Sequence, residues 1–313
     1  MMNGAMNDRL VTLIGGGGFL GRYVAQALLK AGARVRVAER DPRRAFFLKP
    51  LGGLGQTQFV AADVTRPDTI ARAVEGADWV VNLVGSFTGN LQRLHVDGPR
   101  AIAEAAARTG AAMVHVSAIG ADAESPAVYA RTKALGEAAV RAAHSGATIL
   151  RPATVFGRED QFVNRFAGMI ASLPVVPVLK PQTRFQPVFV GDVAQAATTA
   201  LADPSFHGRL FELGGPQVLT MMELHQWIAD AIGHRPRLLP MPDAAGALLA
   251  ALPLTPISRD QWHLLQRDTV VTIGAEGLEA LGVARTPLGA VAPGWLVRFR
   301  RAGRFGAIHE VAG

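Results

Sequence analysis

Cysteine is absent from the 313 residues, and the sequence also lacks metal-ligand spacings and long apolar runs. Without cysteine the chain forms neither disulfides nor thiolate metal sites, and a reducing cytoplasmic setting suits it. The eight histidines form no H-E-x-x-H or similar spacing, so we expect no metal site. The longest apolar stretch, residues 244–252, is too short to span a bilayer, which predicts that the protein is not integral to a membrane.

Positive charge is abundant but is not organised into one region. The formal net charge is +7 and the pI is about 10.6, a balance that suits nucleic acid or an anionic membrane as partner. Only four of the 32 basic residues are lysine, which indicates a compositional preference for arginine. Because the arginines are spread along the chain without interleaved aromatics, we exclude nucleic acid. The C-terminal Arg298, Arg300, Arg301 and Arg304 are either a solvated basic end or a contact with an anionic membrane surface.

Short apolar strands alternate strictly with helical stretches through the first half of the chain. This alternation predicts an α/β fold with a Rossmann-type, doubly wound parallel sheet. Prolines break the rhythm later, so we expect an NAD(P)-binding domain over residues 1–157 and a smaller C-terminal α/β lobe over residues 158–313. Strands are predicted at 10–14, 33–38, 58–61, 79–83, 112–116, 148–150 and 187–190, and helices at 19–31, 68–74, 91–108, 127–143, 192–201 and 222–232.

Three glycines, Gly15, Gly18 and Gly21, lie between the first strand and the first helix in the pattern G-x-x-G-x-x-G. Glycine lets the chain turn tightly and brings backbone amides up to a pyrophosphate, whose charge is then stabilised at the helix N-terminus. A glycine triplet alone is a weak signal. In this strand-to-helix context it predicts dinucleotide binding.

The residues after the second strand point to different cofactors. Glu39 would accept a hydrogen bond from the ribose 2′-OH of NAD, whereas the neighbouring Arg40 would pair with the 2′-phosphate of NADP. We favour NADP(H), since Arg43 and Arg44 add positive charge close by, and NAD(H) stays open. Asp63, directly after the third strand, is a candidate contact to the adenine edge or simply a turn residue.

Tyr129 and Lys133 are four residues apart on a predicted helix and so lie on one face of it. An ammonium beside a phenol is expected to lower the phenol's pKa, which would let Tyr129 act as a general acid or base while Lys133 holds the nicotinamide ribose. Ser117, at the end of the fifth strand, is placed to bind the reacting oxygen. With two tyrosines and four lysines in the chain, chance produces such a pair in about 3% of cases.

These motifs, with several more selective stretches, give the chain a resemblance that runs from residue 10 to about residue 296. It resembles the nucleotide-binding accessory subunit of respiratory complex I, the NADH dehydrogenase alpha-subcomplex subunit nine family, an atypical group of extended short-chain dehydrogenases. The stretches that carry the resemblance are residues 15–24 (GGGGFLGRYV), 51–56 (LGGLGQ), 81–85 (VNLVG), 115–122 (HVSAIGAD), 149–152 (ILRP), 155–160 (VFGRED), 185–192 (FQPVFVGD) and 257–261 (ISRDQ).

The resemblance implies tightly held NADP(H) and a mainly structural role on the peripheral arm of complex I, beside subunits near the quinone-reducing region. It implies a cytoplasmic protein, peripheral on the inner face of the bacterial inner membrane. Arg40 matches the arginine that the family places after the second strand, and Asn82-Leu-Val-Gly85 departs from the Asn-Ala-Gly of ordinary dehydrogenases. The expected cofactor contacts are Gly15, Gly18, Phe19, Leu20, Gly21, Arg40, Asp63, Val64, Leu83, Val84, Gly85, Tyr129, Lys133 and Pro152.

Two functions follow from these residues. The first is an NADP(H)-binding accessory subunit of the NADH:quinone oxidoreductase that does not turn its cofactor over. The alternative is an active NAD(P)-dependent short-chain oxidoreductase or sugar-nucleotide epimerase/dehydratase, in which Ser117, Tyr129 and Lys133 are catalytic.

Overall fold

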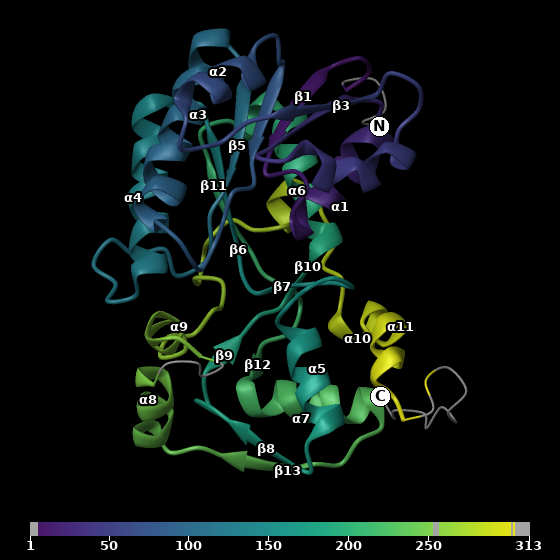
Figure 1. Cartoon of the computed structure of the whole chain (residues 1–313), viewed down its shortest axis with the longest axis vertical. Coiled ribbons are helices and arrows are strands. Elements are labelled where there is room, and N and C mark those ends of the chain that lie inside the picture. Colours follow the sequence, from purple (N-terminus) through teal and green to yellow (C-terminus); the bar gives the residue numbers. More distant parts are fainter. Residues whose placement is uncertain (1–5, 253–256, 302, 304–313) are drawn as a thin grey trace. The chain divides into compact units, whose positions relative to one another are not determined.

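The computed structural model describes residues 6–252, 257–301 and 303, which form two compact units (Figure 1). The first unit holds residues 6–152, 190–213 and 272–284, and the second holds residues 153–189, 214–252, 257–271, 285–301 and 303. The sequence suggests one boundary after residue 157, whereas here the chain leaves the first unit after Pro152 and returns to it twice. Within the described ranges no helix combines the length and apolar character needed to cross a bilayer.

A seven-stranded sheet forms the centre of the first unit. Its strands are β1 (Leu10–Ile14), β2 (Arg34–Glu39), β3 (Thr57–Ala61), β4 (Trp79–Asn82), β5 (Ala112–Val116), β6 (Thr148–Pro152) and β11 (Leu210–Leu213). The order is β11-β6-β5-β4-β1-β2-β3, and all neighbouring pairs are parallel. The predicted doubly wound parallel sheet is confirmed. Strand β11 is an addition to the prediction, since its partner β6 lies far back in the sequence.

Helices cover both faces of this sheet (Figure 1). One face carries α2 (Pro67–Val74), α3 (Gly98–Thr109) and α4 (Val128–Ala143), and the other carries α1 (Phe19–Lys30) and α6 (Val190–Ala202). The core below α2, α3 and α4 is aliphatic and includes Ile70, Ile102, Met113 and Val140. Burial on both faces explains why the central strands β1, β4 and β5 are mostly apolar. The unit also contains the 3-10 helix η1 (Pro42–Leu51) and two short 3-10 turns, η3 (Pro204–Phe206) and η4 (Glu279–Leu281).

The helix predicted over residues 91–108 contains a wide turn. Residues Arg93–Asp97 form a π-helix, η2, before α3 begins at Gly98. Helix α4 packs directly on this turn, because a Cβ added at Gly136 would overlap the carbonyl oxygen of His95. Such π turns often lie at functional sites, and here the turn places the His95 side chain inside the unit.

The second unit is built from short strand pairs and helices. The pairs are β7 (Val155–Phe156) with β10 (Val188–Phe189), β8 (Val175–Val178) with β13 (Arg237–Pro240), and β9 (Arg184–Phe185) with β12 (Leu219–Thr220), of which only the last is antiparallel. The helices are α5 (Val163–Ser172), α7 (Met221–Ile232), α8 (Asp243–Ala251), α9 (Arg259–Leu264), α10 (Leu288–Val291), α11 (Pro293–Leu296) and the 3-10 turn η5 (Val297–Phe299).

Local sequence signals set the ends of two helices in this unit. Thr220 and Glu223 form a reciprocal capping box at the start of α7, and Gly233 ends that helix in the left-handed conformation. Ser258 and Gln261 form a second capping box at the start of α9. The unit's core consists mainly of apolar side chains from α5, α7 and α11.

Candidate functional site

The glycine loop joins β1 to α1 and needs glycine at several positions. Gly15 has a φ of 83°, and its amide donates to the carbonyl of Ala38 at 3.0 Å. A Cβ at Gly21 would overlap the carbonyl oxygen of Gly16, so a side chain there would force the loop apart. The loop therefore folds back closely on itself at the C-terminal end of β1.

The first turn of α1 leaves backbone amides available to a ligand. Its N-cap is Gly18, no side chain caps the turn, and no acidic residue lies in it. Phe19 and Leu20 are half-buried and Gly18 is exposed. Uncapped amides at a helix N-terminus attract an anion. This cradle fits the pyrophosphate of a dinucleotide.

The end of β4 lies against the glycine loop. A Cβ on Gly15 would be 3.3 Å from Val84 Cγ2 and 3.4 Å from the carbonyl carbon of Leu83. The carboxamide of Asn82 fixes this segment, since its oxygen accepts from the Val84 amide at 3.1 Å. Gly85 lies beside the ammonium of Lys133, 3.7 Å from an added Cβ. These predicted cofactor residues are thus brought together.

Two other predicted residues have mainly structural neighbours. Val64 packs against the start of α3, where a Cβ added at Gly98 would be 2.9 Å from Val64 Cβ. Pro152 ends β6, is in register with Leu213, and accepts a hydrogen bond from the Ile119 amide at 3.0 Å.

At the end of β2, Glu39 and Arg40 have different surroundings. The Glu39 carboxylate accepts a hydrogen bond of 2.7 Å from the Gly17 amide, so it is turned toward the glycine loop. Arg40 is exposed, and within the described part of the chain its guanidinium has no hydrogen-bond partner. The arginine is therefore available to an anionic group, while the glutamate is engaged.

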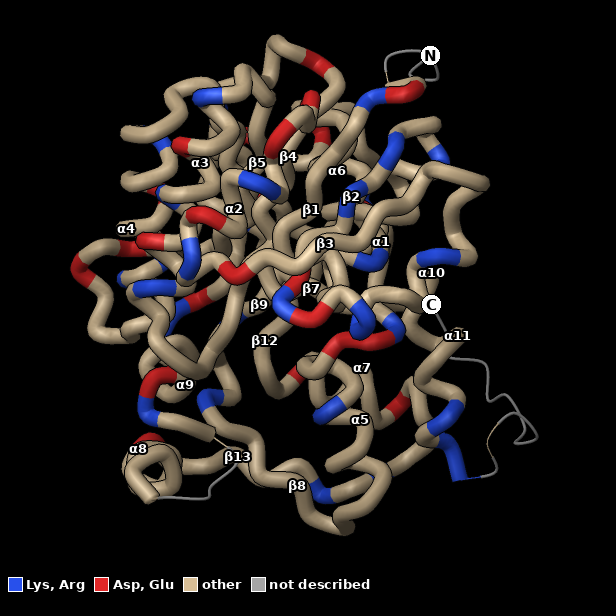
Figure 2. Tube along the Cα trace, turned by 45° about the horizontal axis from the view of Figure 1, so that its top comes forward, with Lys and Arg blue, Asp and Glu red and all other residues tan. Residues whose placement is uncertain are grey.

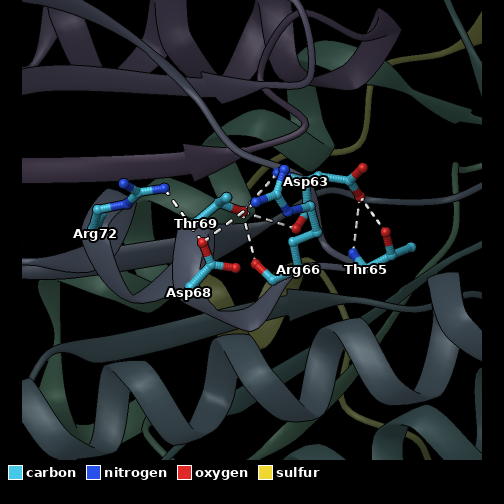
Figure 3. Close-up of polar contacts among 6 residues, drawn as sticks. All are labelled: Asp63, Thr65, Arg66, Asp68, Thr69 and Arg72. Carbon is cyan, nitrogen blue, oxygen red and sulfur yellow. Dashed lines mark hydrogen bonds and ion pairs between the residues drawn. The ribbon is translucent and has the colours of Figure 1, made fainter.

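Asp63 organises the turn between β3 and α2 (Figure 3). Its carboxylate accepts from the amide of Thr65 at 2.9 Å and from the Thr65 hydroxyl at 2.8 Å. The Thr69 hydroxyl lies 3.0 Å from the Asp63 carbonyl and 2.7 Å from that of Arg66. The Thr65 amide, aided by the charges of Arg40 and Arg66, lowers the pKa of the Asp63 carboxyl below its ordinary value. One of the two roles predicted for Asp63, that of a turn residue, is present.

Tyr129 and Lys133 lie on α4 above the ends of β4 and β5. The Lys133 ammonium is almost fully buried and donates to the Val116 carbonyl at 3.1 Å. Burial lowers the pKa of Lys133 to about 8, partly opposed by the carboxylate of Glu137. Burial also raises the pKa of Tyr129 to about 12, which is opposite to the predicted direction. Loss of solvation penalises the phenolate, so the phenol is neutral near pH 7.

Ser117 follows β5 immediately and is buried. Its amide donates to the Leu150 carbonyl at 2.7 Å, which ties it to β6. Its hydroxyl oxygen is inaccessible to solvent and has no hydrogen-bond partner among the described residues. Native structures rarely leave a buried hydroxyl unpaired, so this hydroxyl is a candidate to pair with a polar group that the described residues do not supply.

A series of hydrogen bonds that the sequence did not predict leads to the backbone of Tyr129. His95 Nε2 accepts from the Ser86 amide at 3.2 Å, so the proton is on Nδ1, which donates to Thr132 Oγ1 at 2.9 Å. The Thr132 hydroxyl donates to the Tyr129 carbonyl at 3.1 Å. Burial lowers the pKa of His95 to about 4, with a smaller contribution from Lys133. The histidine is therefore neutral and fixed in one tautomer.

Two rings enclose the ring of Tyr129. His95 meets it edge-on with centroids 5.3 Å apart, and Phe87 lies nearly parallel to it at 4.4 Å. Phe87 itself is 55% exposed and belongs to the loop after β4 that His95 anchors through Ser86. No local sequence signal marks either residue, because their roles depend on the π turn and on the loop's position.

A buried ion-pair network holds α4 to the sheet. Arg151 on β6 binds Glu137 through two hydrogen bonds of 2.8 and 2.9 Å. It also reaches Glu212 on β11 at 3.4 Å, and the second oxygen of Glu212 accepts from the Thr272 amide at 2.8 Å. These contacts raise the pKa of Arg151. Helix α4, which carries Tyr129 and Lys133, is thereby fixed at its C-terminal half.

Comparison with known proteins identifies the family. The model of the NAD dependent epimerase/dehydratase family matches residues 11–214. The mouse (Mus musculus) protein NADH dehydrogenase (ubiquinone) 1 alpha subcomplex subunit 9, mitochondrial, is 34% identical over 293 residues, covering 89% of this chain and 77% of the mouse protein. The chain belongs to the subunit 9 branch of the epimerase/dehydratase family. The resemblance predicted from the sequence is confirmed.

Proteins similar to this chain include an enzyme. The ceramide reductase of Caulobacter vibrioides is 33% identical over 253 residues, covering 77% of this chain and 78% of the reductase. Among solved structures, the triphenylmethane reductase of Citrobacter sp. superposes with a TM-score of 0.74 at 20% identity and covers 91% of this chain and 99% of that protein. At that identity the structural likeness establishes the fold only.

Proposed function

We propose that this chain is an NADP(H)-binding accessory subunit of the NADH:quinone oxidoreductase, complex I, and that it holds its cofactor without turnover. The observation that carries the proposal is the identity of 34% with the mouse subunit 9, sustained over 89% of this chain. The similarity therefore includes the second unit as well as the dinucleotide-binding region that all members of the family share.

The glycine loop and the end of β2 support NADP(H) as the cofactor. The uncapped amides of α1 would hold the pyrophosphate, and the free guanidinium of Arg40 would pair with the 2′-phosphate. Glu39 is engaged by the Gly17 amide and is not required as a ribose ligand. Lys133 and Ser117 would bind at the nicotinamide end. When bound, NADPH supplies a hydride donor, which an accessory subunit would hold as a structural element.

The surroundings of Tyr129 suit a side chain that holds a bound cofactor. A pKa of about 12 keeps the phenol protonated near pH 7, so it can donate a hydrogen bond to a bound group but is a poor base for oxidation of an alcohol. Phe87 stacks on one face of its ring and His95 contacts its edge. Such enclosure suits a side chain that holds a bound group in place.

The proposed partners are the complex I subunits near the quinone-reducing region, at the cytoplasmic face of the inner membrane. Anionic lipid is a second proposed contact, through the basic C-terminal segment (Figure 2). Arg298 and Arg301 are exposed there, while the Arg300 guanidinium donates to the Ala231 carbonyl at 3.1 and 3.2 Å. Arg304 lies outside the described residues.

Purification from native membranes tests this function. An affinity-tagged chain is recovered after gentle detergent extraction, and its partners and nucleotide are identified by mass spectrometry and chromatography. We expect complex I subunits and about one NADP(H) per chain. A chain recovered without complex I subunits, or without nucleotide, contradicts the proposal.

A second candidate is a carbonyl reductase that acts on a lipid, and the similarity to ceramide reductase favours it. In this function the neutral Tyr129 phenol would give its proton to the carbonyl oxygen as hydride reaches the carbon, which yields an alcohol and oxidised cofactor. The buried hydroxyl of Ser117 would bind the same oxygen. NADPH oxidation by long-chain lipid ketones, abolished in Tyr129→Phe, would establish this activity, and an inert cofactor with all of them would exclude it.

A further inference from the structure

A hydrogen-bonded turn between η1 and β3 exposes the side chain of Leu54 to solvent. The Gln56 amide donates to the Gly53 carbonyl at 3.2 Å, and the Gln56 side-chain oxygen accepts from the Gly53 amide at 2.7 Å. Gly55 has a φ of 78°, a conformation that favours glycine. Leu54, at the tip of this turn, is fully exposed. The turn is one of the family-specific stretches of the sequence, and cofactor binding does not account for it.

The base of the turn is rigid as well. The Gln56 carbonyl accepts from the Val35 amide at 2.7 Å, and its side-chain nitrogen donates to the Ala33 carbonyl at 3.4 Å. These bonds tie the turn to the start of β2. A leucine presented on such a support loses little conformational freedom when it enters a recess in a partner.

Three more large apolar side chains of the same β2-to-β3 connection are exposed. Phe46, Phe47 and Leu51 are 40–41% accessible. Lys49 Nζ lies 3.6 Å from the centre of the Phe46 ring, and the Arg22 guanidinium lies 4.3 Å from that of Phe47. The rings are therefore flanked by cations, and Leu54 is the one member of the group that is fully exposed.

Cations dominate the charge of this connection. Arg40, Arg43, Arg44 and Lys49 outnumber the single anion of the connection, Asp41, which pairs with Arg43 at 2.9 Å. A basic connection that carries an apolar anchor is complementary to an acidic surface with an apolar recess. Anionic lipid would match the charge equally well, and it is the single, rigidly held anchor that favours a recess in a folded protein.

We propose that Phe46, Phe47, Leu51 and Leu54, the Leu54 surface, dock this chain onto an acidic protein subunit with an apolar recess. This inference rests on the proposed function, since that subunit would belong to the same complex I assembly. Leu54 is the anchor of the contact, and Lys49, which lies over the Phe46 ring, contributes positive charge.

Photo-crosslinking from position 54 tests the proposal in the intact chain and native membranes. The photoreactive p-benzoylphenylalanine replaces Leu54, and in a control chain it replaces Ile273, another fully exposed apolar residue of the first unit. We expect a covalent adduct with one complex I subunit from position 54 and none from position 273. Adducts only with lipid, or the same adducts from both positions, would overturn the proposal.

Co-purification of variants separates this inference from the proposed function. Leu54→Asp and Lys49→Glu are expected to reduce recovery of complex I subunits at least about tenfold, whereas Ile273→Asp leaves it unchanged. All three positions are exposed, so folding is preserved, which thermal unfolding verifies. If the Leu54 variant and the wild-type chain recover equal amounts of complex I subunits, the proposed docking role of the Leu54 surface is refuted and the proposed function is not. If the wild-type chain recovers no complex I subunits, both proposals fail.

Discussion

The carboxylate of Glu39 accepts a hydrogen bond of 2.7 Å from the backbone amide of Gly17, which couples the end of β2 to the glycine loop. The same carboxylate lies 3.0 Å from the position that a Cβ on Gly17 would take. Glu39 therefore stabilises the glycine loop through this hydrogen bond. From the sequence alone, it is predicted only as a possible ligand of the ribose 2′-OH of NAD. Its charge and its hydrogen bond can be separated by substitution.

Glu39→Gln is expected to increase the preference for NADP over NAD severalfold. Glutamine can still accept from the Gly17 amide, but it removes the negative charge that repels a 2′-phosphate. The measurement is the ratio of the dissociation constants for the two nucleotides. An unchanged ratio would mean that the carboxylate does not face the bound ribose.

Arg40→Ala is expected to weaken NADP(H) binding about 10- to 100-fold and to leave NAD(H) binding nearly unchanged, because charge-assisted bonds to the phosphate are lost. Titration calorimetry with both nucleotides measures this difference. Arg141→Ala, which removes an exposed arginine near the end of α4, is the matched control. Equal losses for both nucleotides would argue against contact with the 2′-phosphate.

Gly21→Ala is expected to abolish nucleotide binding and to lower the free energy of unfolding by about 1–3 kcal/mol, since the new Cβ would overlap the Gly16 carbonyl oxygen. Gly289→Ala is the control, because a Cβ at Gly289 meets no atom within 4 Å. Denaturant unfolding and nucleotide titration of both variants test this. Normal binding by Gly21→Ala would show that the loop can open without losing its function.

The free energy of unfolding is expected to fall as the pH is lowered from about 6.5 to about 4, because unfolded His95 takes up a proton near its ordinary pKa of 6.5 whereas the folded residue resists protonation down to about 4. The contribution to the free energy of unfolding is on the order of 3 kcal/mol. It is fully present above the pKa of the unfolded histidine and is lost as the pH falls through the pKa of the folded one. His95→Gln should reduce this slope in urea titrations at several pH values. The exposed His263→Gln should not, and identical slopes for both variants would contradict the buried, neutral assignment.

Arg151→Ala is expected to destabilise the protein by about 3–5 kcal/mol, because Glu137 and Glu212 would remain buried without their cation. The triple variant Arg151→Met, Glu137→Gln, Glu212→Gln should recover much of that loss, since no uncompensated charge remains. Thermal and denaturant unfolding measure both variants. If the single and triple variants are equally unstable, packing of the arginine and not its charge is what holds α4.

Features that depend on near neighbours in the sequence could be predicted, and those that depend on distant ones could not. Strand β5 has the predicted bounds, and the strand-loop-helix run around Gly15 follows from local composition. The pairing of β11 with β6 carries no local signal. The Tyr129–Lys133 pair follows from helical spacing, but the direction of the tyrosine's pKa is set by burial, which spacing does not report.

The return of the chain at β11 also affects the order in which the protein can be made. When synthesis reaches residue 157, β6 still lacks one neighbour and Arg151 lacks Glu212, because both are supplied by residues Leu210–Leu213. The Thr272 amide, which donates a hydrogen bond to the Glu212 carboxylate, is synthesised later still. The nascent sheet therefore has an open edge on the ribosome until residues 153–189 of the second unit, and then β11 itself, have been translated.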